Sequence, residues 1–172
     1  MKLAPRLGYL ALFCVLSACG DEREDAAAPP AAAGDEAAAA DIAPANLKPA
    51  VLVHKSSTCG CCRVWIDHMQ SHGFPVKSID DEDIGAIKER LGVPYGKGSC
   101  HTAEVEGYFI EGHVPANEVE RLLTEKPKAK GLTVPGMPIG SPGMEQGDRV
   151  DPYEVLLVHE DGSTSVYAKY PQ

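Results

Sequence analysis

Hydrophobic residues after position 50 follow two spacings in turn, which predicts strands that alternate with helices. The short run Val51-Leu52-Val53 is rich in β-branched side chains and favours a buried strand. Further on, large apolar side chains recur three and four residues apart, as one face of a helix requires: Cys62, Trp65, Ile66 and Met69. This helix should open around residues 59–62, with Ser57 or Thr58 as its N-cap.

The same order of strand and helix then repeats. Residues 76–79 indicate a second strand, and a second helix follows with three apolar side chains on one face: Ile84, Ile87 and Leu91. Its N-cap is expected at Asp81 or Asp83. A β-α-β-α beginning predicts parallel strands joined by a right-handed crossover.

The second half of the chain indicates further strands and one more helix. The expected elements are two strands within 102–114 with a turn near Gly107, a helix from Pro115, a Pro/Gly loop over 131–147, and a hairpin of 153–159 with 164–167. The dipeptide Asp161-Gly162 suits the tight turn of that hairpin. Together the elements predict the α/β class, with a central mixed sheet flanked by helices and a C-terminal β-hairpin.

The N-terminus has the three parts of a secretory signal. Lys2 and Arg6 are basic, the ten residues 7–16 are apolar, and small residues follow. Ten residues are too few to cross a hydrocarbon core, which takes about 20. The stretch Leu16-Ser17-Ala18-Cys19 resembles the lipobox of bacterial lipoproteins, so we expect cleavage before Cys19 and lipidation of that residue. The alternative is an ordinary cleaved signal in which the cysteine falls by chance.

These features divide the chain into three parts. The signal peptide covers residues 1–19, and residues 20–48 form a linker rich in Ala, Pro, Asp and Glu. That composition buries too little apolar surface to fold. Residues 49–172 remain as one domain, a length that fits a single hydrophobic core. The expected location is the periplasm, with a lipid anchor in the inner or the outer membrane.

The charge balance excludes two classes of partner. The chain has a formal net charge of −9, and residues 49–172 hold 18 Asp and Glu against 12 Lys and Arg. A negative surface repels phosphate backbones and anionic lipids. We therefore expect no nucleic-acid partner, and membrane contact only through the lipid anchor.

Cysteine carries the clearest chemical signal of the domain, at positions 59, 61, 62 and 100. The first three lie at the expected start of a helix, where free N–H groups and the helix dipole lower a thiol pKa. Cys59 and Cys62 have the C-x-x-C spacing of thioredoxin-like redox sites. The extra Cys61 favours metal binding, because three or four thiolates in one place suit Cu(I), with Zn(II) or an iron–sulfur centre as alternatives.

Histidine and methionine supply further candidate ligands. Cys100-His101 follows a flexible glycine-containing segment and makes a Cys-His ligand pair. Met137 and Met144 lie in the Pro/Gly loop, where a solvated thioether would add little to packing but is a soft ligand for copper. The alternative for each methionine is that it fills a surface gap.

The other histidines carry weaker signals. His54 and His113 are candidates for contact with the cysteine site, with a structural role favoured for both. His68 and His72 are one turn apart and are expected to form a solvated helix face. His159 is expected to be structural or exposed.

Three motifs together resemble one protein family. They are KSSTCGCC at residues 55–62, CHTA at 100–103, and GLTVPGMP with GSPGME between residues 131 and 145. They resemble the bacterial periplasmic metal-binding proteins of the CopG copper-resistance type, over nearly all of residues 50–168. The resemblance implies a thioredoxin-like fold, a cysteine-bridged multi-copper centre, and a role in copper tolerance that includes interconversion of Cu(I) and Cu(II). It also makes Pro135 a candidate for the cis-proline of such folds.

The leading interpretation is a periplasmic copper-binding protein that holds more than one Cu(I) ion. By position in the family motifs, its expected metal ligands are Cys59, Cys61, Cys62 and Cys100, with His101, Met137 and Met144 as further candidates. Copper ions and periplasmic copper chaperones or efflux components are the expected partners. The alternative function is a thiol-disulfide oxidoreductase in which Cys59 attacks and Cys62 resolves. A structural zinc site is the third interpretation.

Overall fold

The computed structural model describes residues 47–171. The signal peptide predicted for residues 1–19, its Cys19, and all but the last two residues of the predicted linker lie outside this range. Within the described residues, none of the helices is long and apolar enough to cross a membrane.

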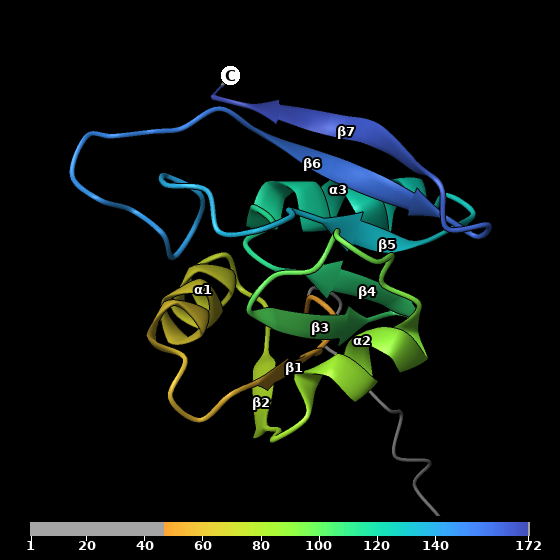
Figure 1. The fold of residues 1–172 in the computed structure, drawn as a ribbon, viewed down its shortest axis with the longest axis horizontal. Coiled ribbons are helices and arrows are strands. Elements are labelled where there is room, and N and C mark those ends of the chain that lie inside the picture. The colour runs from red at the N-terminus through yellow and green to blue at the C-terminus, as the bar shows by residue number, and fades with distance from the viewer. Residues whose placement is uncertain (1–46, 172) are drawn as a thin grey trace, which may run out of the picture. The chain divides into compact units, whose positions relative to one another are not determined.

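A seven-stranded mixed sheet and three helices make up the fold (Figure 1). The elements are β1 (Val51–Lys55), α1 (Gly60–Ser71), β2 (Val76–Asp80), α2 (Ile84–Leu91), β3 (His101–Val105), β4 (Tyr108–Glu111), α3 (Ala116–Glu125), β5 (Ala129–Thr133), β6 (Tyr153–His159) and β7 (Thr164–Tyr170). The strand order is β2-β1-β3-β4-β5-β6-β7, and β1 with β2 and β4 with β5 are the parallel pairs. The predicted α/β class, flanking helices and C-terminal hairpin are confirmed, and the thioredoxin-like label stays a prediction.

The first helix buries the face that its spacing predicts. Cys62, Trp65 and Met69 are fully buried, and Ile66 is partly buried. The predicted N-cap is wrong, because the N-cap is Cys59 itself and no side chain caps the helix. The physical reason is a turn ahead of the helix, in which the Cys59 N–H donates to the Ser56 carbonyl. The Thr58 hydroxyl lies 3.1 Å from that of Ser56 and does not cap the helix.

The second helix is capped by one of the two aspartates that the sequence proposed. The Asp83 carboxylate accepts a hydrogen bond of 3.0 Å from the Ala86 N–H. The helix ends at Gly92, whose φ of +75° suits glycine. None of its residues is fully buried, but the apolar side chains of Ile84, Ile87 and Leu91 are half-buried.

The two faces of the sheet differ in character. Val53, Ala103 and Ile110 point into a hydrophobic core that also takes side chains from α1 and α3. Side chains alternate along a strand, so Thr102 and Glu111 point to the opposite face. There they contact Lys88 of α2. Helix α2 therefore covers a polar part of the sheet beside the start of β3.

Strand β5 was missed by the sequence pattern, which assigned residues 131–147 to one loop. Gly131 and Leu132 pair with β4 on one side and with β6 on the other. A Cβ atom at Gly131 would lie 1.9 Å from the Phe109 carbonyl oxygen, so glycine is what lets these two strands approach. Glycine there, with a register shift beside it, hid a strand that begins at Ala129.

Candidate metal centre

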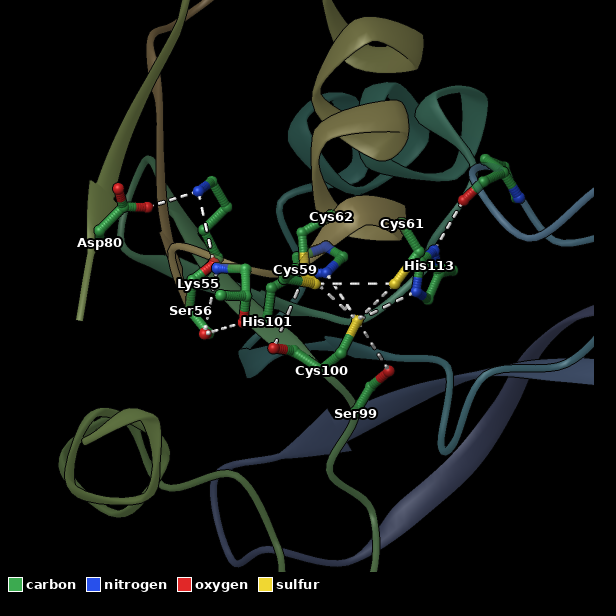
Figure 2. Close-up of a disulfide and its surroundings, with 12 residues drawn as sticks. Lys55, Ser56, Cys59, Cys61, Cys62, Asp80, Ser99, Cys100, His101 and His113 are labelled. Carbon is green, nitrogen blue, oxygen red and sulfur yellow. Dashed lines mark hydrogen bonds and ion pairs between the residues drawn. A yellow bond between two sulfur atoms is a disulfide. The ribbon is translucent and has the colours of Figure 1, made fainter. Parts of the chain in front are cut away.

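Four cysteine sulfur atoms meet where α1 begins and β3 begins (Figure 2). Those of Cys59, Cys61, Cys62 and Cys100 all lie within 4.8 Å of one another. The Cys100 sulfur is 3.7 Å from that of Cys61 and 3.5 Å from that of Cys62. The helix start supplies three sulfurs, and Cys100 arrives from the segment before β3. The chain thus gathers all four cysteines of the domain in one place.

Two of these cysteines form a disulfide in the structure, namely Cys59 and Cys62. Cys61 and Cys100 are free thiols, and both are half-buried. The disulfide follows the C-x-x-C spacing, while the extra Cys61 stays outside it. Reduction of the bond would bring the number of free thiols at this point to four.

Two imidazoles adjoin the sulfur group through Cys100. Its sulfur lies 3.3 Å from Nδ1 of His101 and 3.1 Å from Nε2 of His113. Nδ1 of His113 lies 2.7 Å from the Pro142 carbonyl oxygen, to which it must donate. A neutral His113 therefore keeps the lone pair of Nε2 facing Cys100. A carbonyl that fixes the tautomer in this way is typical of metal-binding histidines.

His101 is buried, and one of its two ring nitrogens has no hydrogen-bond partner among the described residues. Its side chain is fully buried, and Nε2 has no hydrogen-bond partner in the described structure. The ring lies against Trp65 at 4.5 Å and against His113 at 5.1 Å between ring centroids. The nitrogen that faces the Cys100 sulfur is Nδ1, so Nδ1 rather than Nε2 could bind a metal ion held by Cys100.

Burial sets the protonation of these groups. Burial raises the pKa of the Cys100 thiol to about 12, and the neighbouring Cys61 adds to the shift. Burial also lowers the pKa of His113, and lowers that of His101 well below its usual value. At neutral pH the metal-free site therefore holds neutral imidazoles and a protonated Cys100. A metal ion that binds there must displace the thiol proton.

A loop between β5 and β6, residues 134–152, which we call the loop strap, packs against the start of α1. A Cβ atom at Gly143 would lie 2.8 Å from the Cys61 carbonyl oxygen, so only glycine fits this contact. Pro142, the residue before it, holds His113. Met144 follows directly and is half-buried, whereas Met137 is 52% exposed. Both methionines stay predictions as ligands.

His113 lies at the cysteine site, whereas the sequence favoured a structural role for it. The turn at residues 106–107 pairs Thr102 with Glu111, and the same register carried outward puts Cys100 opposite His113. The turn was predicted near Gly107, so this register was the available signal. Pro135, the candidate for a cis-proline, follows a trans peptide bond, because the cis peptide bond among the described residues is Tyr170–Pro171.

The other weaker histidine candidates have structural contacts. His54 lies between two carboxylates, 2.6 Å from Asp81 and 3.0 Å from Glu104. Nε2 of His68 accepts a hydrogen bond of 3.0 Å from the Ala116 N–H at the start of α3. His68 is therefore not the solvated side chain that its spacing with His72 predicted.

Comparison with known proteins finds one family model and two solved structures. Residues 97–144 match the family described as "Protein of unknown function, DUF411". A structure named "Copper resistance protein copG- Form 2" is 49% identical in sequence, with a TM-score of 0.70, over 72% of this chain and 99% of that one. Form 1 of the same protein is also 49% identical, with a TM-score of 0.69, over 73% of this chain and 100% of that one. The search of curated proteins found no match.

Proposed function

The chain belongs to the family of the CopG copper resistance proteins, and we propose that it binds Cu(I) in a cysteine-bridged site with more than one ion. The observation that carries the proposal is the meeting of four cysteine sulfurs within 4.8 Å. Gathered thiolates are soft ligands that favour Cu(I) over harder ions. Nδ1 of His101 and Nε2 of His113 face the Cys100 sulfur and supply borderline donors at the same point.

The position of Cys100 supports more than one ion. It belongs both to the group of four cysteines and to the group formed with His101 and His113. A thiolate has several lone pairs, so one sulfur can bridge two ions. A site for a single ion would need only one of the two groups. The two groups joined at one sulfur therefore favour a multinuclear arrangement.

The disulfide supports a redox role for the same site. Breaking the Cys59–Cys62 bond takes two electrons and two protons and yields two thiols. In the opposite direction, two thiolates that form the bond release two electrons, which convert two Cu(II) ions to two Cu(I) ions. Interconversion of Cu(I) and Cu(II) is thus balanced by cysteines that the structure already pairs.

The setting of this activity is the cell envelope. The predicted signal and Cys19 support export and a lipid anchor, in the inner or the outer membrane. Copper chaperones or efflux components of the periplasm are the partners proposed for transfer of the ion. The negative net charge favours attraction of copper cations and disfavours nucleic acid. A thioredoxin-like arrangement accords with the C-x-x-C turn between β1 and α1.

The test is the metal and thiol content of the full chain, expressed in copper-fed cells and purified without chelator. We expect two or more copper ions per chain, with the four domain thiols protected from Ellman reagent. Cys61→Ser and Cys100→Ser should each lower the copper content. Val64→Ser is the matched control, because Val64 is exposed on the same helix and supplies no donor atom. Unchanged Cu(I) stoichiometry and affinity in Cys59→Ser and Cys61→Ser would contradict the proposal.

A second candidate function rests on the disulfide alone. A thiol-disulfide oxidoreductase would use Cys59 and Cys62 without metal. It predicts reduction of insulin disulfides by the metal-free protein, at a rate that Cys61→Ser leaves unchanged. The copper function predicts that Cys61→Ser lowers the copper content of the protein. This variant therefore separates the two functions in one experiment.

A further inference from the structure

Glu111 is a fully buried carboxylate with a complete set of partners beside the metal centre. One oxygen accepts hydrogen bonds from the Ser99 N–H and from the Lys88 ammonium group. The other accepts one of 2.6 Å from the Thr102 hydroxyl. Lys88 also donates to the Thr102 hydroxyl at 2.9 Å. Burial of a carboxylate is costly unless it is paired and hydrogen-bonded, and here both conditions hold.

Glu111 and its partner Ser99 each lie close to a donor residue in the chain. Ser99 directly precedes Cys100, and Gly112 joins Glu111 to His113. The carboxylate thus ties the segment that carries the sulfur to the strand end that carries the imidazole. These two donor atoms are 3.1 Å apart.

The segment before Cys100 belongs to no strand, and its Lys97 carbonyl oxygen accepts a hydrogen bond of 2.6 Å from the Thr133 hydroxyl at the end of β5. Nearer to Cys100 the contacts are made by Gly98 and Ser99. The Ser99 hydroxyl donates to the Gly136 carbonyl oxygen, and the Gly98 carbonyl oxygen accepts from the Gly136 N–H. Both of those contacts reach the loop strap rather than the sheet. The bond from the Ser99 N–H to Glu111 links the segment to β4 instead. An apolar side chain of the same size could fill the space but could not accept that hydrogen bond.

We propose that the Lys88–Glu111 pair is a positioning device that holds Cys100 and His113 at the spacing required to bind copper. This inference deepens the proposed function and rests on it for the identity of the ion. Glu111 itself touches neither donor atom, so it acts through Ser99 and through the strand end. Lys88 supplies the positive charge that pairs with the carboxylate and holds it in place.

The main test variant is Glu111→Gln, which removes the charge that pairs with Lys88 and leaves one acceptor oxygen for three donors, the Ser99 N–H, the Lys88 ammonium group and the Thr102 hydroxyl. We expect the Ser99 amide of the reduced, metal-free full chain to exchange with solvent about 10- to 100-fold faster, measured by NMR. We expect Cu(I) affinity in a competition titration to fall about 10- to 100-fold, as for other partners that orient metal ligands. The copper–thiolate absorption bands should shift at equal copper content.

The matched control is Glu118→Gln. Glu118 is also a buried carboxylate with a cation and a hydroxyl as partners, Arg121 and Tyr170, but it lies on α3. The variant Glu118→Gln should lower the melting temperature without changing the exchange rate of the Ser99 amide, the copper affinity or the absorption bands. If Glu111→Gln does not fold, the double variant Lys88→Met/Glu111→Leu removes both charges and leaves no unpaired ion. The same three measurements then apply to it.

Each outcome decides the proposal. Faster Ser99 exchange with weaker copper binding supports it, provided that Glu118→Gln shows neither. Unchanged exchange, or faster exchange with unchanged copper binding and bands, overturns it. If the wild-type chain binds no copper, the proposed function fails on its own. The positioning role of Glu111 is then tested by the exchange rate of the Ser99 amide and the alkylation rate of the Cys100 thiol in Glu111→Gln. Rates equal to those of the wild type overturn the proposal.

Discussion

We expect Gly143→Ala to weaken copper binding although residue 143 supplies no donor atom. Gly143 has a φ of +86° and lies in the loop strap against the first turn of α1. A Cβ atom there would stand 2.8 Å from the Cys61 carbonyl oxygen and 2.9 Å from the Trp65 backbone nitrogen. Both are helix backbone atoms, and the Trp65 side chain is fully buried. The loop strap, rather than the helix, must therefore move.

The size of the effect follows from these distances. Ordinary contact begins at 3.4 Å, so the loop must retreat by about 0.6 Å. Pro142 moves with Gly143, and its 2.7 Å hydrogen bond from His113 stretches to about 3.3 Å, beyond the usual range. The positive φ costs roughly 1–2 kcal/mol for alanine and the weakened bond about 0.5–1.5 kcal/mol more. An unanchored metal-binding histidine lowers metal affinity about 10- to 100-fold.

The assay is thermal unfolding of the metal-free chain together with a Cu(I) competition titration. Gly162→Ala is the control, because Gly162 has a φ of +84° in the β6–β7 turn and nothing lies within 4 Å of its Cβ position. It should lose roughly 1–2 kcal/mol of stability and keep the copper affinity of the wild type. Equal destabilisation of the two variants, with wild-type copper affinity in both, would refute the reasoning.

Two further predictions concern stability in the metal-free chain. Burial, with the neighbouring His72, lowers the pKa of His68, so the unfolded chain takes up this proton first as pH falls below about 6.5. His68→Gln should therefore remove up to about 1.4 kcal/mol per pH unit of the stability loss on acidification, measured by denaturant unfolding from pH 7 to pH 5, and an unchanged slope would contradict this. Asp83→Ala removes the α2 cap on the Ala86 N–H and should cost about 1 kcal/mol, while Asp83→Ser, measured in the same way, should restore most of it.

Most of the fold could be predicted because most elements bury one face. The spacing of apolar residues located β1, α1 and the terminal hairpin, which pack side chains into the core, and it also located β2 and α2, although α2 adds no side chain to that core. The sequence pattern missed strand β5 because Gly131 has no side chain to pack and a bulge lies beside it. The N-cap of α1 was misplaced because the turn before it ends one residue later than a hydroxyl cap would require.

The site could be predicted only as far as local spacing reaches. Three cysteines within four residues of a helix start must lie close together, whatever the rest of the chain does. The approach of Cys100 depends on the packing of the segment before β3 against Glu111 and the loop strap, which no sequence spacing reveals. His113 is 13 residues from Cys100 in the chain, and its place follows only once the strand register is known.

The middle cysteine of the motif is what separates the two candidate functions. The Cys61 sulfur lies 3.6 Å from that of Cys59 but stays outside the Cys59–Cys62 disulfide. With the disulfide closed, Cys61 and Cys100 remain as free thiols 3.7 Å apart, beside two imidazoles. Opening the disulfide adds two soft donors and two electrons at the same point. On the proposed function, the number of thiolates available to copper therefore rises and falls with the redox state of the pair, which a simple dithiol catalyst would not require.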